Sequence, residues 1–262
     1  MDDEAIERRA RVIRALAECG CVAPEAEANA LLEASSEGIG PIEDLVARRV
    51  TGEPLPWIIG WTRFCGLRIV VDRGVFVPRP HTQPMARRAA EFLPEAGIAV
   101  DLCTGSGAVA AVLSSMRPSA TVVATDIDPV AVACARRNGV RALTGDLDAP
   151  LPSSLRGGVN VVTAVVPYVP REELHLLPRD VLAHEPRLAL DGGSGGTAVL
   201  IRAAEAAARW LAPGGSALLE LGGDQAPAIA PSLSELGMSE IRVLRDDDGR
   251  DRAIEARSAS VL

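Results

Sequence analysis

Val100-Asp101-Leu102-Cys103-Thr104-Gly105-Ser106-Gly107 is the stretch that decides the fold, because an apolar run ending in an acid and a glycine turn opens a nucleotide-type pocket in α/β proteins. The residues from Ile98 to Leu102 predict a short buried strand, and Ala108 to Ser115 predict the helix that follows it. Gly105 and Gly107 remove side chains where the chain reverses. Backbone N–H groups and the positive end of the helix can therefore approach a ligand closely.

Acidic residues follow the predicted strands of this unit. The run from Ala120 to Ala124 predicts a second strand, and it ends in Thr125-Asp126, about twenty residues beyond the glycines, where an acid grips a ribose diol. Asp101 precedes the glycines, where it suits a cationic amino-acid group and would repel a pyrophosphate. Asp146, in Gly145-Asp146-Leu147, is placed to meet an adenine amino group at the end of the next strand.

Three interpretations of the glycine turn are open at this point. Gly105 to Ala110 also satisfies the relaxed dinucleotide pattern G-x-G-x-x-G/A, and a purely structural turn is the third interpretation. Acids at successive strand ends favour S-adenosylmethionine, which carries an ammonium group, a ribose and an adenine but no phosphate. We therefore expect S-adenosylmethionine as the cofactor and no metal site.

The composition limits the classes of function. The chain has 262 residues, a net charge of −8 and a pI near 5.0, and all 27 basic residues are arginine. This charge disfavours a nucleic-acid partner or a membrane surface but leaves a local basic patch open. No signal-like stretch and no run of about 18 apolar residues is visible, so we expect a cytoplasmic monomer without membrane contact. The five scattered cysteines are expected to be structural thiols.

The apolar pattern divides the chain into three segments. Residues 1–50 carry apolar residues at helical spacing, and residues 51–75 predict a loop and a strand pair that turns near Gly66. Residues 76–262 carry the α/β pattern. At the start of this segment, Pro78-Arg79-Pro80 fixes a stiff, extended backbone of the kind that borders a pocket.

Further elements complete the α/β segment. Thr82 is expected to cap a helix from Met85 to Phe92. Val159 to Val166 is a β-branched run that predicts a buried strand. Ile241 to Leu244 and Ala253 to Ala256 predict a final antiparallel pair, which completes a seven-stranded mixed sheet.

Motifs from about residue 50 to residue 240 occur in the order found in the HemK/PrmC-type protein glutamine methyltransferases, which the chain therefore resembles. They are Gly52-Glu53-Pro54, Phe76-Val77-Pro78-Arg79-Pro80-His81-Thr82, Asp101-Leu102-Cys103-Thr104-Gly105-Ser106-Gly107, Gly145-Asp146-Leu147, Pro167-Tyr168-Val169-Pro170, Glu185-Pro186 with Ala189-Leu190, and Pro213-Gly214-Gly215 with Leu219-Glu220-Leu221-Gly222. The resemblance implies a class I (Rossmann-like) methyltransferase domain at 76–262, an N-terminal helical domain at 1–50 and a β-hairpin link at 51–75. It also implies S-adenosylmethionine as methyl donor and a release factor or similar protein as substrate.

The resemblance also implies the site residues. Those expected to bind the cofactor are Asp101, Cys103, Thr104, Gly105, Ser106, Gly107, Asp126, Ile127, Asp146 and Leu147. Those expected to bind the substrate are Phe76, Arg79, Pro80 and Val165, and those expected in catalysis are Val166, Pro167 and Tyr168. By this likeness the glycine loop lines the methionine end of the cofactor, Asp126 meets the ribose, and Asp146 and Leu147 meet the adenine.

One motif departs from the family. Its members end the fourth strand in Asn-Pro-Pro-Tyr, whereas this chain has Val165-Val166-Pro167-Tyr168. In the family's arrangement the asparagine oxygen and the following backbone carbonyl accept the two hydrogens of the substrate amide and aim its nitrogen at the methyl group. Val165 has no acceptor, and losing one such preorganised contact costs roughly 2.7–4 kcal/mol.

Other residues are candidates for the missing acceptor or for a base. Gln83 and Glu185 lie in motifs that border the pocket, although Glu185 can instead tie down its own loop. His81 and His184 are either surface residues or a general base. We expect a methyltransferase that acts on a protein glutamine amide. The alternatives are a methyltransferase for a small molecule or a nucleic-acid base, and a non-catalytic S-adenosylmethionine-binding protein.

Overall fold

A seven-stranded mixed sheet forms the centre of the computed structural model, which describes residues 3–259 apart from the side chains of Arg179 and Asp180. The order across the sheet is β5-β4-β3-β6-β7-β9-β8; β9 runs antiparallel to both of its neighbours, and the strands from β5 to β7 are parallel. The expected seven-stranded mixed sheet is thus confirmed. Its strands are β3 (Ile98–Leu102), β4 (Thr121–Asp126), β5 (Arg141–Thr144), β6 (Val159–Ala164), β7 (Leu211–Glu220), β8 (Met238–Arg245) and β9 (Asp251–Ser258).

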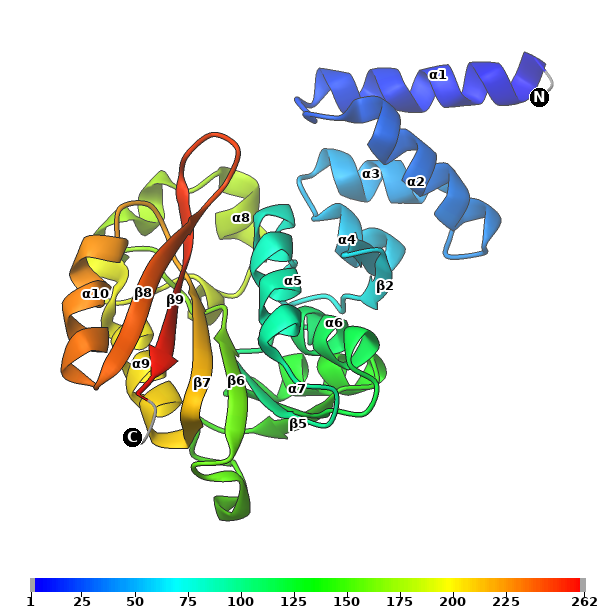
Figure 1. Cartoon of the computed structure of the whole chain (residues 1–262). Coiled ribbons are helices and arrows are strands. Elements are labelled where there is room, and N and C mark those ends of the chain that lie inside the picture. The colour runs from blue at the N-terminus through cyan, green and yellow to red at the C-terminus, as the bar shows by residue number, and fades with distance from the viewer. Residues whose placement is uncertain (1–2, 260–262) are drawn as a thin grey trace.

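Helices cover both faces of this sheet, which explains why the central strands are apolar on both sides (Figure 1). One face packs against α5 (Gln83–Phe92), α6 (Ala108–Met116) and α7 (Pro129–Arg137). The other packs against α9 (Ala198–Trp210) and α10 (Ala226–Glu235). Short α8 (Arg179–His184) lies in the long connection between β6 and α9.

The N-terminal helices form an apolar cluster of their own beside the sheet (Figure 1). They are α1 (Asp3–Glu18), α2 (Pro24–Ser36), α3 (Ile42–Val50) and α4 (Leu55–Ile59). This cluster also includes Ile58, Ile59 and Trp61, whereas Trp57 packs with the core of the sheet. The segment from Trp57 to Trp61 therefore contacts both apolar clusters. The exact division of the chain into three parts stays a prediction. Among the helices within residues 3–259, none is long and apolar enough to cross a bilayer.

A β-hairpin joins the two parts. It consists of β1 (Trp61–Phe64) and β2 (Leu67–Val70), and it turns at Cys65-Gly66, as the sequence predicts. The Asn138 side chain, which follows α7, accepts from Val70 N at 2.8 Å and donates to the oxygens of Val70 at 2.9 Å and of Ser106 at 2.8 Å. This one side chain therefore connects the hairpin, α7 and the loop before α6.

Two local predictions are wrong. The predicted strand from Val159 to Val166 ends at Ala164, so the next residues are free to form a loop. Thr82 does not cap α5, because its backbone is already helical (φ −76°, ψ −21°) and its hydroxyl donates to Glu220. A long-range partner has thus replaced the local capping bond.

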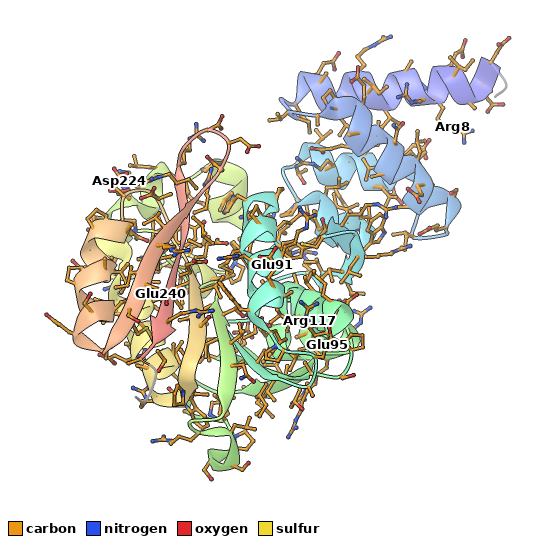
Figure 2. The ribbon with its side chains drawn as sticks, viewed as in Figure 1. Arg8, Glu91, Glu95, Arg117, Asp224 and Glu240 are labelled. Atoms are coloured by element: carbon orange, nitrogen blue, oxygen red, sulfur yellow. The ribbon has the colours of Figure 1, made fainter. Side chains whose placement is uncertain are left out.

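Charged side chains gather on the outside of the molecule (Figure 2). Figure 2 shows Arg117, at the end of α6, beside Glu95, and their closest atoms lie 3.6 Å apart. Glu95 is 72% exposed in its side chain, so this pair adds little to stability. The stability of the fold comes mainly from the apolar clusters.

We predict that Asn138→Ala lowers the free energy of unfolding by about 2–4 kcal/mol, because three partly buried hydrogen bonds are lost and their backbone partners are left unpaired. Urea unfolding measures this change. The matched control is Asn29→Ala, since Asn29 is exposed and its side chain accepts from Arg9 on the surface, and it should change stability by less than about 0.5 kcal/mol. Equal effects of the two substitutions would contradict the connecting role of Asn138.

Candidate active site

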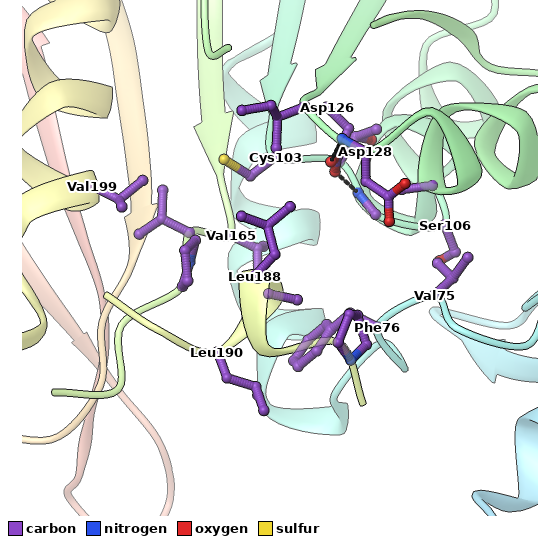
Figure 3. A pocket seen from close by; sticks show the side chains of 18 of the residues that line it. Val75, Phe76, Cys103, Ser106, Asp126, Asp128, Val165, Leu188, Leu190 and Val199 are labelled. Atoms are coloured by element: carbon purple, nitrogen blue, oxygen red, sulfur yellow. Dashed lines mark hydrogen bonds between the residues drawn. The ribbon is translucent and has the colours of Figure 1, made fainter. Parts of the chain in front are cut away.

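A cavity of about 380 Å³ lies at the carboxyl ends of β3, β4 and β6, where an open parallel sheet binds its ligands. Its floor is the loop after β3, and its other walls come from the segment before α5 and from residues 177–191. Figure 3 shows Val165, Leu188 and Val199 on one side and Asp126, Asp128 and Ser106 on the other. The cavity thus has an aliphatic end and an acidic end.

The glycine loop leaves room for a ligand beside its backbone. Gly105 has φ +55°, and a Cβ built on it would meet no atom within 4 Å, so only the missing side chain keeps this space open. Ser106, which also lines the cavity, carries a buried hydroxyl with no hydrogen-bond partner among residues 3–259. A hydroxyl without a partner, beside backbone that a ligand can approach, suits a ligand with several polar groups. S-adenosylmethionine is such a ligand.

Asp101 is buried at the base of the cavity, at 1% exposure. Its two carboxylate oxygens accept from the hydroxyls of Thr104 and Thr163, each at 2.6 Å. Burial raises the pKa of Asp101 to about 6, although the two threonine hydrogen bonds oppose this change. Asp101 therefore fixes the loop against β6. Because it is buried but lines the cavity, its carboxylate can meet a cationic group only from inside the cavity.

Asp126 holds the same loop from the next strand. Its Oδ2 accepts from Gly105 N at 2.8 Å, and its Oδ1 accepts from Asp128 N at 3.0 Å (Figure 3). Burial raises its pKa, whereas the backbone N–H donors lower it. Cys103 lies close by with φ +54°, and burial raises the pKa of its thiol, so this cysteine stays protonated and unreactive.

The third acid lies at the rim of the cavity. Asp146 forms an ion pair with Arg202 of α9, and the two atoms are 2.6 Å apart. The neighbouring Leu147 is buried and has φ +47°, a conformation that is rare for a branched side chain. Both residues line the cavity, and Arg202 adds a planar cation beside them.

Phe76, Arg79 and Tyr168 form the other end of the cavity. The Arg79 guanidinium lies 4.6 Å from the centre of the Phe76 ring and bonds both oxygens of buried Glu185, at 2.6 and 2.8 Å. The Tyr168 ring lies close against Gly222, since a Cβ on that glycine would be 2.3 Å from Tyr168 Cδ2. Burial, aided by the charge of Glu220, raises the pKa of Tyr168 to about 12, so its hydroxyl is neutral.

The structure brings fifteen of the seventeen predicted site residues to the lining of one cavity. They are Phe76, Arg79, Asp101, Cys103, Thr104, Gly105, Ser106, Asp126, Ile127, Asp146, Leu147, Val165, Val166, Pro167 and Tyr168. Pro80 and Gly107 do not line it. Gly107 instead lets α6 approach α7, since its Cβ would lie 3.0 Å from Ala135 Cβ. The roles of all these residues in binding and catalysis stay predictions.

The remaining candidates have other partners. Gln83 Oε1 accepts from Cys65 N at 3.0 Å, so this side chain holds the hairpin. Glu185 pairs with Arg79, and His184 packs edge-on against Trp57. His81 Nε2 lies 3.5 Å from Glu220 Oε1.

Sequence reasoning missed several lining residues. Thr82 was assigned a local cap, and Arg202 lies on a helix with no motif. Asp128 had a usable signal, because Asp-Pro commonly begins a helix; its side chain caps α7 by accepting from Val130 N at 2.8 Å. Within the described residues, no group of three or more His, Cys, Asp and Glu side chains is arranged to hold a metal ion.

Known proteins are similar to this chain over most of its length. Residues 67–145 match the model of the methyltransferase small domain. The release factor glutamine methyltransferase of Geobacter sulfurreducens is 35% identical over 227 residues, which cover 84% of this chain and 79% of that protein. Its counterpart from Mycolicibacterium smegmatis is 37% identical over 84% of this chain and 80% of that protein.

A solved structure supports the fold. The Mtq2–Trm112 complex of E. cuniculi, described as responsible for methylation of the eRF1 translation termination factor, contains a chain with a TM-score of 0.52 and 21% identity to this one. The match covers 71% of this chain and 99% of that chain. At this identity the similarity concerns the fold alone.

We predict a pH-dependent effect of Asp101→Asn. Because the pKa of Asp101 is raised to about 6, the folded protein binds this proton more tightly than the unfolded chain does. Its contribution to stability is therefore complete below about pH 4 and is lost as the pH rises through about 6. The variant cannot titrate there, so its stability relative to the wild type should increase by about 2–3 kcal/mol between pH 4 and pH 7.

Urea unfolding at several pH values checks this prediction. The control is Asp247→Asn, because Asp247 is exposed. A stability difference between Asp101→Asn and the wild type that does not change with pH would show that Asp101 does not titrate in this range.

Proposed function

Because the chain belongs to the family of release factor glutamine methyltransferases, we propose that it transfers a methyl group from S-adenosylmethionine to the side-chain amide nitrogen of a glutamine in a release factor. One observation carries this proposal. A single cavity joins the glycine loop and acids of β3 and β4 to the Val166-Pro167-Tyr168 loop after β6. Both reactants can therefore meet in one place. The fold is that of a class I methyltransferase, as the sequence implied.

The acidic end of the cavity suits the cofactor. The open backbone at Gly105 and the orphaned hydroxyl of Ser106 accommodate the methionine portion. Asp126 lies at the end of β4, where a carboxylate accepts from ribose hydroxyls. Asp146 and Leu147 border the adenine position. When bound there, S-adenosylmethionine would supply an electrophilic methyl group for the amide nitrogen, with S-adenosylhomocysteine as the leaving group and one amide proton released.

The other end suits a planar amide. Phe76 and Tyr168 offer aromatic walls, and the Arg79–Glu185 pair holds the segment that carries Phe76. The backbone carbonyl of Val166 remains as an acceptor for an amide hydrogen whatever side chain the residue carries. An acceptor of this kind acts by orienting the nitrogen lone pair toward the methyl group.

The substrate sets the cellular setting of the proposal. A release factor works in translation, so the reaction belongs in the cytoplasm. In this proposal residues 76–262 form the catalytic domain. The helical segment at 1–50 and the hairpin link at 51–75 precede it in the chain. We assign the protein substrate to the mouth of the cavity, where Leu188 lines the cavity and is 56% exposed.

Methyl transfer from radiolabelled S-adenosylmethionine tests the function. The purified protein is incubated with release factors and, separately, with cell extract that is later divided into protein, nucleic-acid and small-molecule fractions. We expect label in one glutamine of a release factor, located by mass spectrometry of its peptides. Label in another fraction, or binding of the cofactor without any transfer, would replace the proposal with one of the alternatives that Val165 raises.

We also predict that Asp126→Ala weakens S-adenosylmethionine binding by about 10- to 100-fold, because the ribose contact and the support of the Gly105 backbone are lost together. Titration calorimetry measures the affinity. Asp247→Ala is the control at an exposed residue that does not line the cavity, and it should bind as the wild type does. Unchanged affinity in Asp126→Ala would contradict a ribose contact at Asp126.

A further inference from the structure

The position of Val165 in the sheet identifies its neighbour. β6 and β7 are adjacent parallel strands, and their register pairs Ala164 with Leu219. Val165 is the first residue after β6, and Glu220 follows Leu219 as the last residue of β7. Ala164 and Leu219 both pack on the face that α9 and α10 cover, and side chains alternate along a strand. Val165 packs against the core on the opposite face, the one that α5 covers, and Glu220 bonds Thr82 on that face.

Thr82 bonds Glu220 on this face. The Thr82 hydroxyl donates to Glu220 Oε2 at 2.5 Å, and Thr82 lines the cavity at the start of α5. A hydroxyl has one proton to donate and two lone pairs that accept. Because the proton is engaged by a carboxylate, the oxygen of Thr82 can act toward any further group only as an acceptor.

Two neighbours hold the Glu220 side chain in the position in which it accepts from Thr82. It is 1% exposed, and a buried carboxylate requires compensating partners. Its Oε1 faces His81 Nε2 at 3.5 Å, and neither atom has a hydrogen-bond partner within residues 3–259. The imidazole thus provides a polar neighbour on one side of the carboxylate, and Thr82 provides a short hydrogen bond on the other.

We propose that the hydroxyl oxygen of Thr82, oriented by Glu220, accepts one amide hydrogen of the substrate and so replaces the acceptor that Val165 lacks. This inference rests on the proposed glutamine methylation. The backbone carbonyl of Val166 accepts the other hydrogen. Thr82 is the residue that touches the substrate, and Glu220 is a positioning residue that acts through it.

The other polar candidates are already engaged. Gln83 Oε1 bonds Cys65 N, and both oxygens of Glu185 bond Arg79. Neither side chain lines the cavity, whereas Thr82 does. Thr82 accepts a substrate hydrogen without losing its bond to Glu220, because the two interactions use different parts of the hydroxyl.

Steady-state kinetics of glutamine methylation test the proposal. Thr82→Val keeps the shape of the side chain but removes the acceptor, so kcat should fall about 100-fold with little change in KM. Thr82→Ser keeps the hydroxyl and should stay within about threefold of the wild type. Thr121→Val, at the exposed opposite end of β4, is the matched control.

Glu220 is tested by two replacements and by a rescue. Glu220→Gln retains an oxygen that accepts from Thr82 and should keep most of the activity, whereas Glu220→Met frees the Thr82 proton and should lower kcat as Thr82→Val does. Adding Val165→Asn to Thr82→Val supplies an acceptor at position 165 instead and should regain at least tenfold in kcat. A merely structural role for Thr82 predicts that Val165→Asn raises kcat by the same factor in the wild type and in Thr82→Val, whereas replacement of one acceptor by the other predicts a smaller gain in the wild type.

The outcomes separate this inference from the function itself. Calorimetric binding of S-adenosylmethionine confirms that each variant is folded; if Thr82→Val alone does not bind it, Thr82→Val combined with Glu220→Gln removes the unpaired charge and takes its place. Wild-type methylation of glutamine together with unchanged kcat in Thr82→Val overturns the role of Thr82 and leaves the proposed function intact. A wild type that does not methylate glutamine overturns both.

Discussion

The carboxylate of Asp101 joins the two halves of the site. One of its oxygens receives the hydroxyl of Thr104, in the glycine loop, and the other receives the hydroxyl of Thr163, in β6. β6 leads directly into the loop of Val166, Pro167 and Tyr168. This buried acid therefore ties the glycine loop to β6, in addition to the backbone pairing of β3 with β6.

The sequence predicted the parts of the fold that depend on local pattern. Apolar runs bounded by turns identify β3, β4 and the final antiparallel pair, because buried strands need such runs. The acids at the ends of β3, β4 and β5 were also found, since parallel strands bring their carboxyl ends to one edge. Fifteen predicted site residues consequently share one cavity.

What the sequence did not predict depends on partners far along the chain. Thr82 is a residue type that often caps helices, but its hydroxyl donates a hydrogen bond to Glu220, 138 residues away. Gly107 has the position of a ligand-binding glycine, but its lack of a side chain serves the packing of α6 on α7. Arg202 lies on a helix without a motif, and only the folded sheet brings it to Asp146. Local sequence propensity contains no information about contacts between residues that lie far apart in the chain.

The separate apolar cluster of the N-terminal helices has a consequence for the order of folding during synthesis. Its members lie between Val12 and Trp61, so they contact one another as soon as this part of the chain has left the ribosome. β3 must wait for β6, whose paired residues lie 62 positions later, before the centre of its sheet is complete. Local contacts form quickly and distant strand pairs slowly. The helices can thus be folded, and can hold the hairpin, while the catalytic sheet is still being made.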